Sequence, residues 1–258
     1  MKIICLAENT ASRDGIDAEH GLSLYIEGAG KKILFDMGQS DLFMRNAEKL
    51  KVDLSQVDIV VLSHGHYDHG GGLAAFLEVN SKAPVHMSRY AFLPYYNGRE
   101  KYIGLDTSLS SNGRIVFTDG EVDISDGITL YPFSAVTLRR PVLSGGLNKK
   151  VDGAFVPDDF LHEQYMMIRE NGKSVLVSGC SHRGIYNIVT SFTPDVLIGG
   201  FHFSKLPLDG TLVKYAEELA GQNTDYYTCH CTGEGQFEFM RAHMGRLHYL
   251  SGGDVLLL

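Results

Sequence analysis

Four short apolar segments of this 258-residue chain are each followed within a few positions by a histidine, and this pattern constrains the fold most. These histidines are His64, His182, His202 and His230. In open α/β sheets, ligands bind beyond the carboxyl ends of the strands. A single histidine at a strand end is usually a hydrogen-bonded structural residue. Four of them, next to glycines that permit close backbone approach, predict one shared site.

The first histidine belongs to a polar run at positions 63–72. His64, His66, Asp68 and His69 fall within six positions, between a strand-like segment and the glycine cluster Gly70–Gly72. Zinc and related divalent metals bind histidine nitrogen and carboxylate oxygen. In a tight turn, His64 and His66 can share one ion, and Asp68 and His69 can reach a second. Two such ions can activate water and clamp a substrate oxygen.

Apolar periodicity predicts two halves, each beginning with strands and ending in strand–helix alternation. The first half is expected to hold strands at Lys2–Glu8, Leu22–Glu27, Lys32–Asp36, Val57–Leu62 and Pro84–Ser88, with helices at Asp41–Leu50 and Leu73–Val79. The second is expected to hold strands at Ile128–Phe133, Gln164–Arg169, Ser174–Ser178, Val196–Ile198, Tyr226–Thr228 and Val255–Leu258, with helices at Gly184–Phe192, Leu212–Ala220 and Phe237–Met244. Helices covering the outer faces of two sheets predict an α/β fold, a four-layer αββα sandwich in a single domain, 1–258.

Two stretches lack this periodicity. Residues 89–112 are rich in Tyr and Gly and are interpreted as a lid or substrate loop. Residues 137–159 are expected to be irregular, and such long loops are usually functional or disordered. The candidates for binding a substrate phosphate, each with a solvated surface as the alternative, are Arg139, Arg140, Lys149, Lys150 and Arg183.

The net charge of −8 argues against general nucleic-acid binding. The chain contains no run of about 18 apolar residues, so no transmembrane helix is predicted. The N-terminal residues are typical of a strand rather than of a signal peptide. The four cysteines form no Cys-x-x-Cys pair, which favours a reducing cytoplasm over a disulfide framework. We therefore expect a cytoplasmic protein whose partner is a small-molecule substrate, with the oligomeric state left open.

The run His64-Gly65-His66-Tyr67-Asp68-His69 resembles the His-x-His-x-Asp-His signature of the metallo-β-lactamase superfamily. This resemblance covers nearly the whole chain and implies the αββα fold. Within the superfamily, the chain is most similar to the 7,8-dihydropterin–ribofuranosylaminobenzene 5′-phosphate synthase-like group. The segments that carry this likeness are Glu8-Asn9, Glu19–Ser23, Leu62–Leu73, Gly179–His182, Gly199–His202 and His230–Gly233.

The resemblance implies a set of metal ligands. It places His64 and His66 on a first metal, and Asp68, His69 and His230 on a second. The implied cofactor is one or two zinc ions, with manganese, iron or magnesium as alternatives.

The chain departs from the family pattern where most members carry a bridging aspartate. That strand ends here in Gly179-Cys180, with His182 two positions further on. Either His182 supplies the third imidazole of the first metal, or Cys180 takes the bridging position. We favour His182, because imidazole is the commonest metal ligand in proteins. The missing aspartate leaves a site with one metal open.

Further residues have two interpretations or rest on the resemblance alone. Asp68 and His202 are the candidate catalytic residues; His202 is either a general acid or a partner that orients a ligand. Asp36 is expected to support a ligand, and Glu163 and His20 to border the pocket. Cys229 and Cys231 are expected to face away from His230 as small buried residues.

Three functions follow as hypotheses. The first is a metal-dependent hydrolase or transferase acting on a small phosphorylated or heterocyclic substrate. The second is the specific synthase reaction of the similar group, and fold-level likeness is a weak guide to substrate. The third is a non-catalytic sensor or binding module stabilised by its metal. An iron oxidoreductase is less favoured, because the chain lacks a dinucleotide-binding glycine fingerprint.

Overall fold

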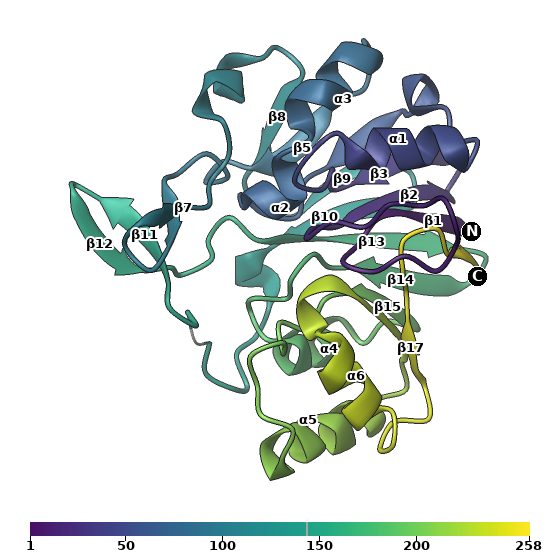
Figure 1. The fold of residues 1–258 in the computed structure, drawn as a ribbon, viewed down its shortest axis with the longest axis vertical. Helices are drawn as coiled ribbons and strands as arrows, with labels where there is room; N and C mark the ends of the chain where they lie inside the picture. The colour runs from purple at the N-terminus through teal and green to yellow at the C-terminus, as the bar shows by residue number, and fades with distance from the viewer. Residues whose placement is uncertain (143) are drawn as a thin grey trace.

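Two seven-stranded sheets form the centre of the computed structural model, which describes residues 1–142 and 144–258. The first sheet has the order β18-β1-β2-β3-β4-β5-β8. Its strands are β18 (Val255–Leu257), β1 (Lys2–Ala7), β2 (Ser23–Gly28), β3 (Lys31–Phe35), β4 (Ile59–Val61), β5 (Val85–Ser88) and β8 (Ile115–Thr118). The pairs from β3 to β8 are parallel and the others antiparallel. N- and C-terminal strands lie side by side in this sheet (Figure 1).

The second sheet has the order β17-β16-β15-β14-β13-β10-β9. Its strands are β17 (Leu247–Tyr249), β16 (Asp225–Thr228), β15 (Val196–Gly199), β14 (Lys173–Val177), β13 (Gln164–Glu170), β10 (Ile128–Pro132) and β9 (Val122–Ser125). Strands β14 to β17 are parallel. Their carboxyl ends therefore meet at one edge of the sheet.

Helices cover the outer face of each sheet (Figure 1). Helices α1 (Leu42–Lys49) and α3 (Leu73–Val79) lie on the first sheet, and α4 (Ile185–Phe192), α5 (Gly210–Ala220) and α6 (Glu234–Met240) lie on the second. The short helix α2 (Tyr67–Gly70) follows β4. The predicted αββα sandwich is thereby confirmed.

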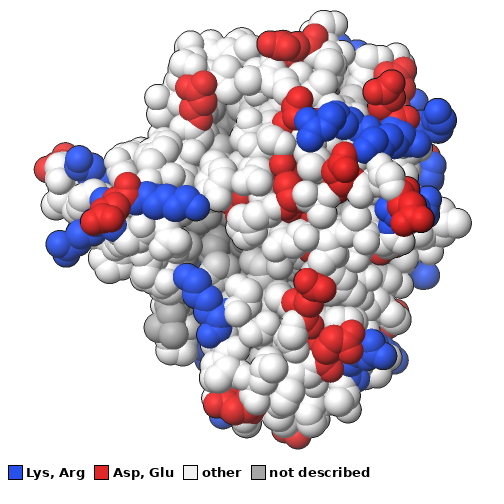
Figure 2. Space-filling model, viewed as in Figure 1, with Lys and Arg blue, Asp and Glu red and all other residues white. Residues whose placement is uncertain are grey.

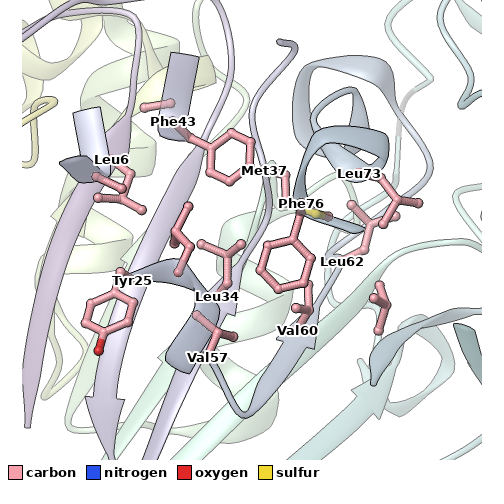
Figure 3. Close-up of a cluster of buried hydrophobic side chains, with 14 of the residues drawn as sticks. Leu6, Tyr25, Leu34, Met37, Phe43, Val57, Val60, Leu62, Leu73 and Phe76 are labelled. Atoms are coloured by element: carbon pink, nitrogen blue, oxygen red, sulfur yellow. The ribbon is translucent and has the colours of Figure 1, made fainter. Parts of the chain in front are cut away.

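Alternating strand residues divide the core into layers, because successive side chains of a strand point to opposite faces. Ile33, Phe35 and Val61 meet Met166 and Val177 between the sheets. The intervening residues of the first sheet, Leu34, Val60 and Leu62, instead pack under the helices with Phe43 and Phe76 (Figure 3). Burial of each large apolar side chain contributes about 1.5–3 kcal/mol, so both faces of the sheet stabilise the sandwich.

A small third sheet lies within the two stretches that lacked periodicity, so the prediction of an irregular segment at 137–159 is wrong for Leu147–Val151 and Ala154–Pro157. The order β12-β11-β6-β7 comprises β12 (Ala154–Pro157), β11 (Leu147–Val151), β6 (Tyr95–Asn97) and β7 (Lys101–Tyr102). These strands project from the sandwich (Figure 1), and many of their side chains are polar or exposed. They therefore show no apolar alternation in the sequence.

Other element boundaries shift by a few residues. A 3₁₀ turn, η1 (Leu54–Gln56), is capped by the Asp53 side chain and precedes β4. Strand β4 spans Ile59–Val61 and is shorter than the strand predicted at 57–62. The helix expected at 237–244 begins at Glu234 and ends at Met240. Further 3₁₀ turns are η2 (Thr107–Ser111), η3 (Phe133–Ala135) and η4 (His230–Thr232). Among the described residues, no helix is long and apolar enough to cross a membrane.

Candidate metal centre

Asp36, at the end of β3, holds the histidine-rich turn after β4 in place. Its carboxylate accepts hydrogen bonds from Ser63 N at 2.7 Å, from Ser63 Oγ at 2.7 Å and from His69 Nδ1 at 2.6 Å. The same Ser63 Oγ also lies 2.8 Å from His64 Nδ1. Because Ser63 gives its single hydroxyl proton to Asp36, His64 Nδ1 must donate to Ser63. With Nδ1 as the donor, Nε2 is the ring nitrogen that both His64 and His69 present to the rest of the cluster.

His230, at the start of η4, is oriented in the same way. Its Nδ1 lies 2.8 Å from Asn9 Oδ1, an acceptor, so Nδ1 is the donor and Nε2 faces the cluster. Glu8 accepts a hydrogen bond from the His230 backbone N–H at 2.5 Å. Residues near the N-terminus thus fix a histidine that lies more than 220 positions later.

The first half of the candidate centre consists of His64, His66 and His182, whose possible ligand atoms lie within 4.8 Å of one another. The Nε2 atoms of His64 and His182 are 3.4 Å apart. Phe160 stacks on His182, with ring centroids 4.3 Å apart and an interplanar angle of 3°. All three imidazoles are buried.

The second half consists of Asp68, His69 and His230. The Nε2 atoms of His69 and His230 are 3.2 Å apart, and Asp68 Oδ2 lies 3.4 Å from His230 Nε2 and 4.0 Å from His69 Nε2. His20 contacts the same carboxylate oxygen at 3.2 Å. The structure thus brings together all six predicted metal-ligand candidates in two adjoining groups.

Cys180 lies between the two halves. Its sulfur is 3.2 Å from His69 Nε2 and groups with His64 and His69 within 4.8 Å. The sequence left His182 and Cys180 as alternatives, but each side chain occupies its own place in the structure. His182 completes the three-imidazole group, and Cys180 lies beside His69, between that group and the second half.

Close packing of the two strand ends requires glycine before Cys180. A Cβ atom at Gly179 would lie 2.2 Å from Ser63 Oγ, the atom that links Asp36 to His64. Such a contact is well inside van der Waals distance. Gly179 therefore allows the second sheet to approach the turn that carries the first histidines.

His202 and Cys231 lie on the other side of Cys180, within 4.8 Å of it. Cys231 is buried, as expected, but it also lines the pocket, so the interpretation of Cys231 as a merely structural residue does not hold. The chain turns into η4 after Cys229, so strand alternation does not apply there. Cys229 itself is buried in the core between the sheets.

The electrostatics of the cluster disfavour protonated imidazoles in the first half. Burial, reinforced by the neighbouring imidazoles, lowers the pKa of His64 and His182 well below 6.5. Burial also lowers the pKa of His66 to about 4. Burial alone would lower the pKa of His230, but Asp68 and Cys231 raise it to about 9. Burial likewise opposes protonation of His202, yet its contact with Cys231 raises the pKa of His202.

The donor set fits a divalent metal ion. Within residues 1–142 and 144–258, buried His66 Nε2, His182 Nδ1 and His202 Nδ1 have no hydrogen-bond partner. Unpaired buried polar atoms are costly, and lone pairs 3.2–3.4 Å apart repel unless a proton or cation lies between them. Imidazole, carboxylate and thiolate are zinc ligands.

A second network supports His66 and was missed by the sequence analysis. His162 accepts a hydrogen bond from Gly65 N at 2.8 Å and donates to Asp158 Oδ2 at 3.1 Å, and that oxygen lies 3.7 Å from His66 Nε2. The adjacent Glu163 does not line the pocket. It accepts hydrogen bonds from the backbone N–H groups of His182 and Arg183.

A pocket of about 370 Å³ opens over the cluster. Its described lining includes His20, Asp68, His202, Lys101 and Lys205. Figure 2 shows a hollow on this face beside the projecting third sheet, with basic side chains on two sides of it. This volume suits a small molecule.

The basic residues singled out in the sequence do not belong to this described lining. Arg140 pairs with Glu218, and Lys149 with Asp159 at 2.6 Å. Arg139 donates to Thr190, while Lys150 and Arg183 lie over aromatic rings. The pocket instead receives Lys101 from β7 and Lys205 from the loop after β15. Neither lysine belonged to a dense basic run, so charge clustering gave no signal for them.

The profile of the metallo-beta-lactamase superfamily matches residues 16–219. An uncharacterized protein of Methanocaldococcus jannaschii is 31% identical over 88% of this chain and 89% of its own length. The 7,8-dihydropterin-6-methyl-4-(beta-D-ribofuranosyl)-aminobenzene-5′-phosphate synthase of the same organism is 27% identical, with 96% of each chain covered. A solved structure described as a metal-dependent hydrolase of the beta-lactamase superfamily is 31% identical, with a TM-score of 0.86. The alignment covers 100% of this chain and 99% of the chain in that structure. The chain therefore belongs to the metallo-beta-lactamase superfamily.

Proposed function

We propose that this protein is a metal-dependent hydrolase with a two-ion, zinc-type centre, acting on a small phosphorylated substrate in the cytoplasm. The observation that carries the proposal is the convergence of imidazole Nε2 atoms: His64 faces His182 at 3.4 Å, and His69 faces His230 at 3.2 Å. Each half of the cluster has three donor side chains in all, so each is equipped to bind one ion.

Two groups of residues would each bind one ion. His64, His66 and His182 would hold the first ion, and Asp68, His69 and His230 the second, with Cys180 between them. Nitrogen and sulfur donors favour zinc over magnesium or manganese, which prefer oxygen. When bound, the ions would polarise a substrate oxygen and activate water.

Recognition and proton transfer would come from the pocket walls. Lys101 and Lys205 line the pocket and would bind the anionic part of the substrate. His202 lines the same pocket, and its raised pKa supports a role as the proton donor to a leaving group. Asp68 carries negative charge into the centre, because His69, His20 and His230 hold the pKa of its carboxyl well below 3.8 despite its burial.

The test combines metal analysis with hydrolysis of a generic phosphodiester, bis(p-nitrophenyl) phosphate. The wild type should purify with about two zinc ions per chain. His64→Ala and Asp68→Ala should lose metal and activity, whereas Lys149→Ala, a control outside the pocket lining, should keep both. A folded wild type that binds no divalent metal would reject the proposal. Metal-dependent stability without hydrolysis of any substrate in a broad screen would favour the non-catalytic sensor instead.

The full-length similarity to the synthase favours one second candidate, a transferase joining a dihydropterin diphosphate to a ribofuranosylaminobenzene phosphate. Both substrates carry phosphate groups that Lys101 and Lys205 would accommodate. Incubation with the two substrates, with pyrophosphate release as the readout, decides it. Absence of product at high enzyme concentration would exclude this reaction and leave hydrolysis standing.

A further inference from the structure

Two of the four cysteines meet at the floor of the pocket. The sulfurs of Cys180 and Cys231 and the His202 imidazole lie within 4.8 Å of one another, and both cysteines line the pocket. Cys5 and Cys229 are instead completely buried in the core between the sheets. A small reagent that enters the pocket can therefore reach one pair of thiols and not the other.

Close packing of three strand ends holds this pair together. Gly200 N donates to Gly179 O at 2.8 Å, and a Cβ atom at Gly200 would lie 2.3 Å from the Cys231 sulfur. That sulfur lies 3.6 Å from Cys180 O. The backbones that carry the two thiols are thus already adjacent. The sulfurs, which lie within 4.8 Å of each other, must approach to the bonding distance of about 2.05 Å.

We propose that Cys180 and Cys231 form a redox modification site, which a peroxide converts into an intramolecular disulfide. One thiol attacks the peroxide oxygen to give a sulfenic acid and one water. The second thiol then attacks that sulfur, forming the S–S bond and releasing a second water. Two thiols lose two electrons and hydrogen peroxide gains them. A reversible disulfide of this kind in a reducing compartment acts as a sensor rather than as a structural link.

Oxidation would act directly on the metal centre. Cys180 Sγ lies 3.2 Å from His69 Nε2, between the two halves of the cluster. A sulfur bound in a disulfide cannot serve as a thiolate ligand. Oxidised protein should therefore bind metal more weakly, and bound metal should slow oxidation. These two consequences rest on the proposed function, whereas formation of the disulfide does not.

The experiment treats metal-free, full-length protein with hydrogen peroxide and maps cysteine peptides by mass spectrometry after alkylation. A Cys180–Cys231 crosslink, with a mass loss of two hydrogens that dithiothreitol reverses, is the expected result. Cys229→Ser serves as the matched control, because it removes a cysteine two positions away, and it should crosslink as the wild type does. Cys231→Ser should give no crosslink.

A second measurement, of zinc affinity, distinguishes failure of the modification site from failure of the proposed metal centre. Zinc affinity of the oxidised wild type should fall at least tenfold relative to the reduced protein, and treated Cys231→Ser should not show this redox-dependent fall. Sulfinic acids or no modification at Cys180 and Cys231 would overturn the modification site, even if the reduced protein binds zinc and is active. A crosslink in a protein that binds no zinc in either state would retain the site and reject the metal centre.

Discussion

Asp36 and His69 lie 33 positions apart, yet the buried Asp36 carboxylate accepts a hydrogen bond from His69 Nδ1 at 2.6 Å. The same carboxylate receives two hydrogen bonds from Ser63, which in turn contacts His64. One side chain outside the ligand set thus orients an imidazole in each half of the cluster. Such supporting partners govern metal affinity nearly as strongly as the ligands do.

Asp36→Asn should weaken metal binding by about 10- to 100-fold, because the amide removes the negative charge that orients His69. Asparagine tolerates the left-handed backbone of this position, where φ is +59°, so the variant should fold. Competition with a chromogenic chelator measures the affinity. Asp58→Asn, at a partly exposed position on the same sheet, is the control. Equal affinity in Asp36→Asn and wild type would contradict the supporting role.

Removal of metal should destabilise the protein. An ion present at 100 times its Kd stabilises the folded state by about 2.7 kcal/mol. For a chain of this length, that loss lowers the Tm by about 5–10 °C. Calorimetry with and without EDTA measures the shift. His64→Ala, which removes a ligand of the first ion, should show a smaller shift than the wild type, and an equal response of both proteins to EDTA would show that the chelator acts elsewhere.

The metal-free protein should lose stability as the pH falls from about 6.5 to about 4, the pKa of buried His66. In this window the unfolded chain binds a proton that folded His66 resists, so stability falls by up to about 1.4 kcal/mol per pH unit. The His66 contribution is fully present above pH 6.5. Urea denaturation across this range measures it, and His66→Gln should flatten the dependence.

In the metal-free protein, the contribution of His230 to folding stability should depend on pH in the opposite direction to that of His66. Its pKa is raised to about 9, so its contribution to stability is fully present below about 6.5 and is lost as the pH rises through 9. Asp68→Asn removes the carboxylate whose hydrogen bond contributes most to raising the pKa of His230. Denaturation between pH 6.5 and 9.5 should show a shallower decline in that variant. Parallel curves for variant and wild type would argue against the Asp68–His230 pair.

Lys101→Ala and Lys205→Ala should each raise the KM of an anionic substrate about tenfold, equivalent to about 1.4 kcal/mol. The kcat should change less, because neither ammonium group belongs to the cluster of candidate metal ligands. The effect should shrink at high salt, since exposed charges are screened. Lys149→Ala, whose ammonium pairs with Asp159, is the control. An unchanged KM in both pocket variants would remove these lysines from substrate recognition.

Gly179→Ala should destabilise the protein by about 1–3 kcal/mol, because the new methyl group would overlap Ser63 Oγ. Metal affinity should fall as well, since Ser63 links Asp36 to His64. Gly235→Ala, where a Cβ atom meets nothing within 4 Å, is the matched control in helix α6. Denaturation and metal titration of both variants test this, and equal stability of the two would refute the packing argument.

The sequence was informative wherever apolar periodicity was strong. The strands around Leu34 and Val177 are short apolar runs buried on both faces, and the order of such strands and amphipathic helices along the chain predicted both sheets and their helical covers. The third sheet escaped prediction because strands such as β11, with Asn148, Lys149 and Lys150, expose polar side chains. Their pairing depends on partners about 50 positions away, which local pattern does not encode.

The histidines that follow the strands identified the candidate centre, and adjacent motifs identified the superfamily. By itself the sequence determined which residues are candidate metal ligands, because ligand type and strand-end position are local properties. Tertiary structure alone decided how they combine: it gave His182 and Cys180 separate places, and brought Cys231, Lys101 and Lys205 into the pocket. It also joined Asn9 to His230. Those relations arise from the approach of strand ends in two sheets, which depends on the packing of the whole sandwich.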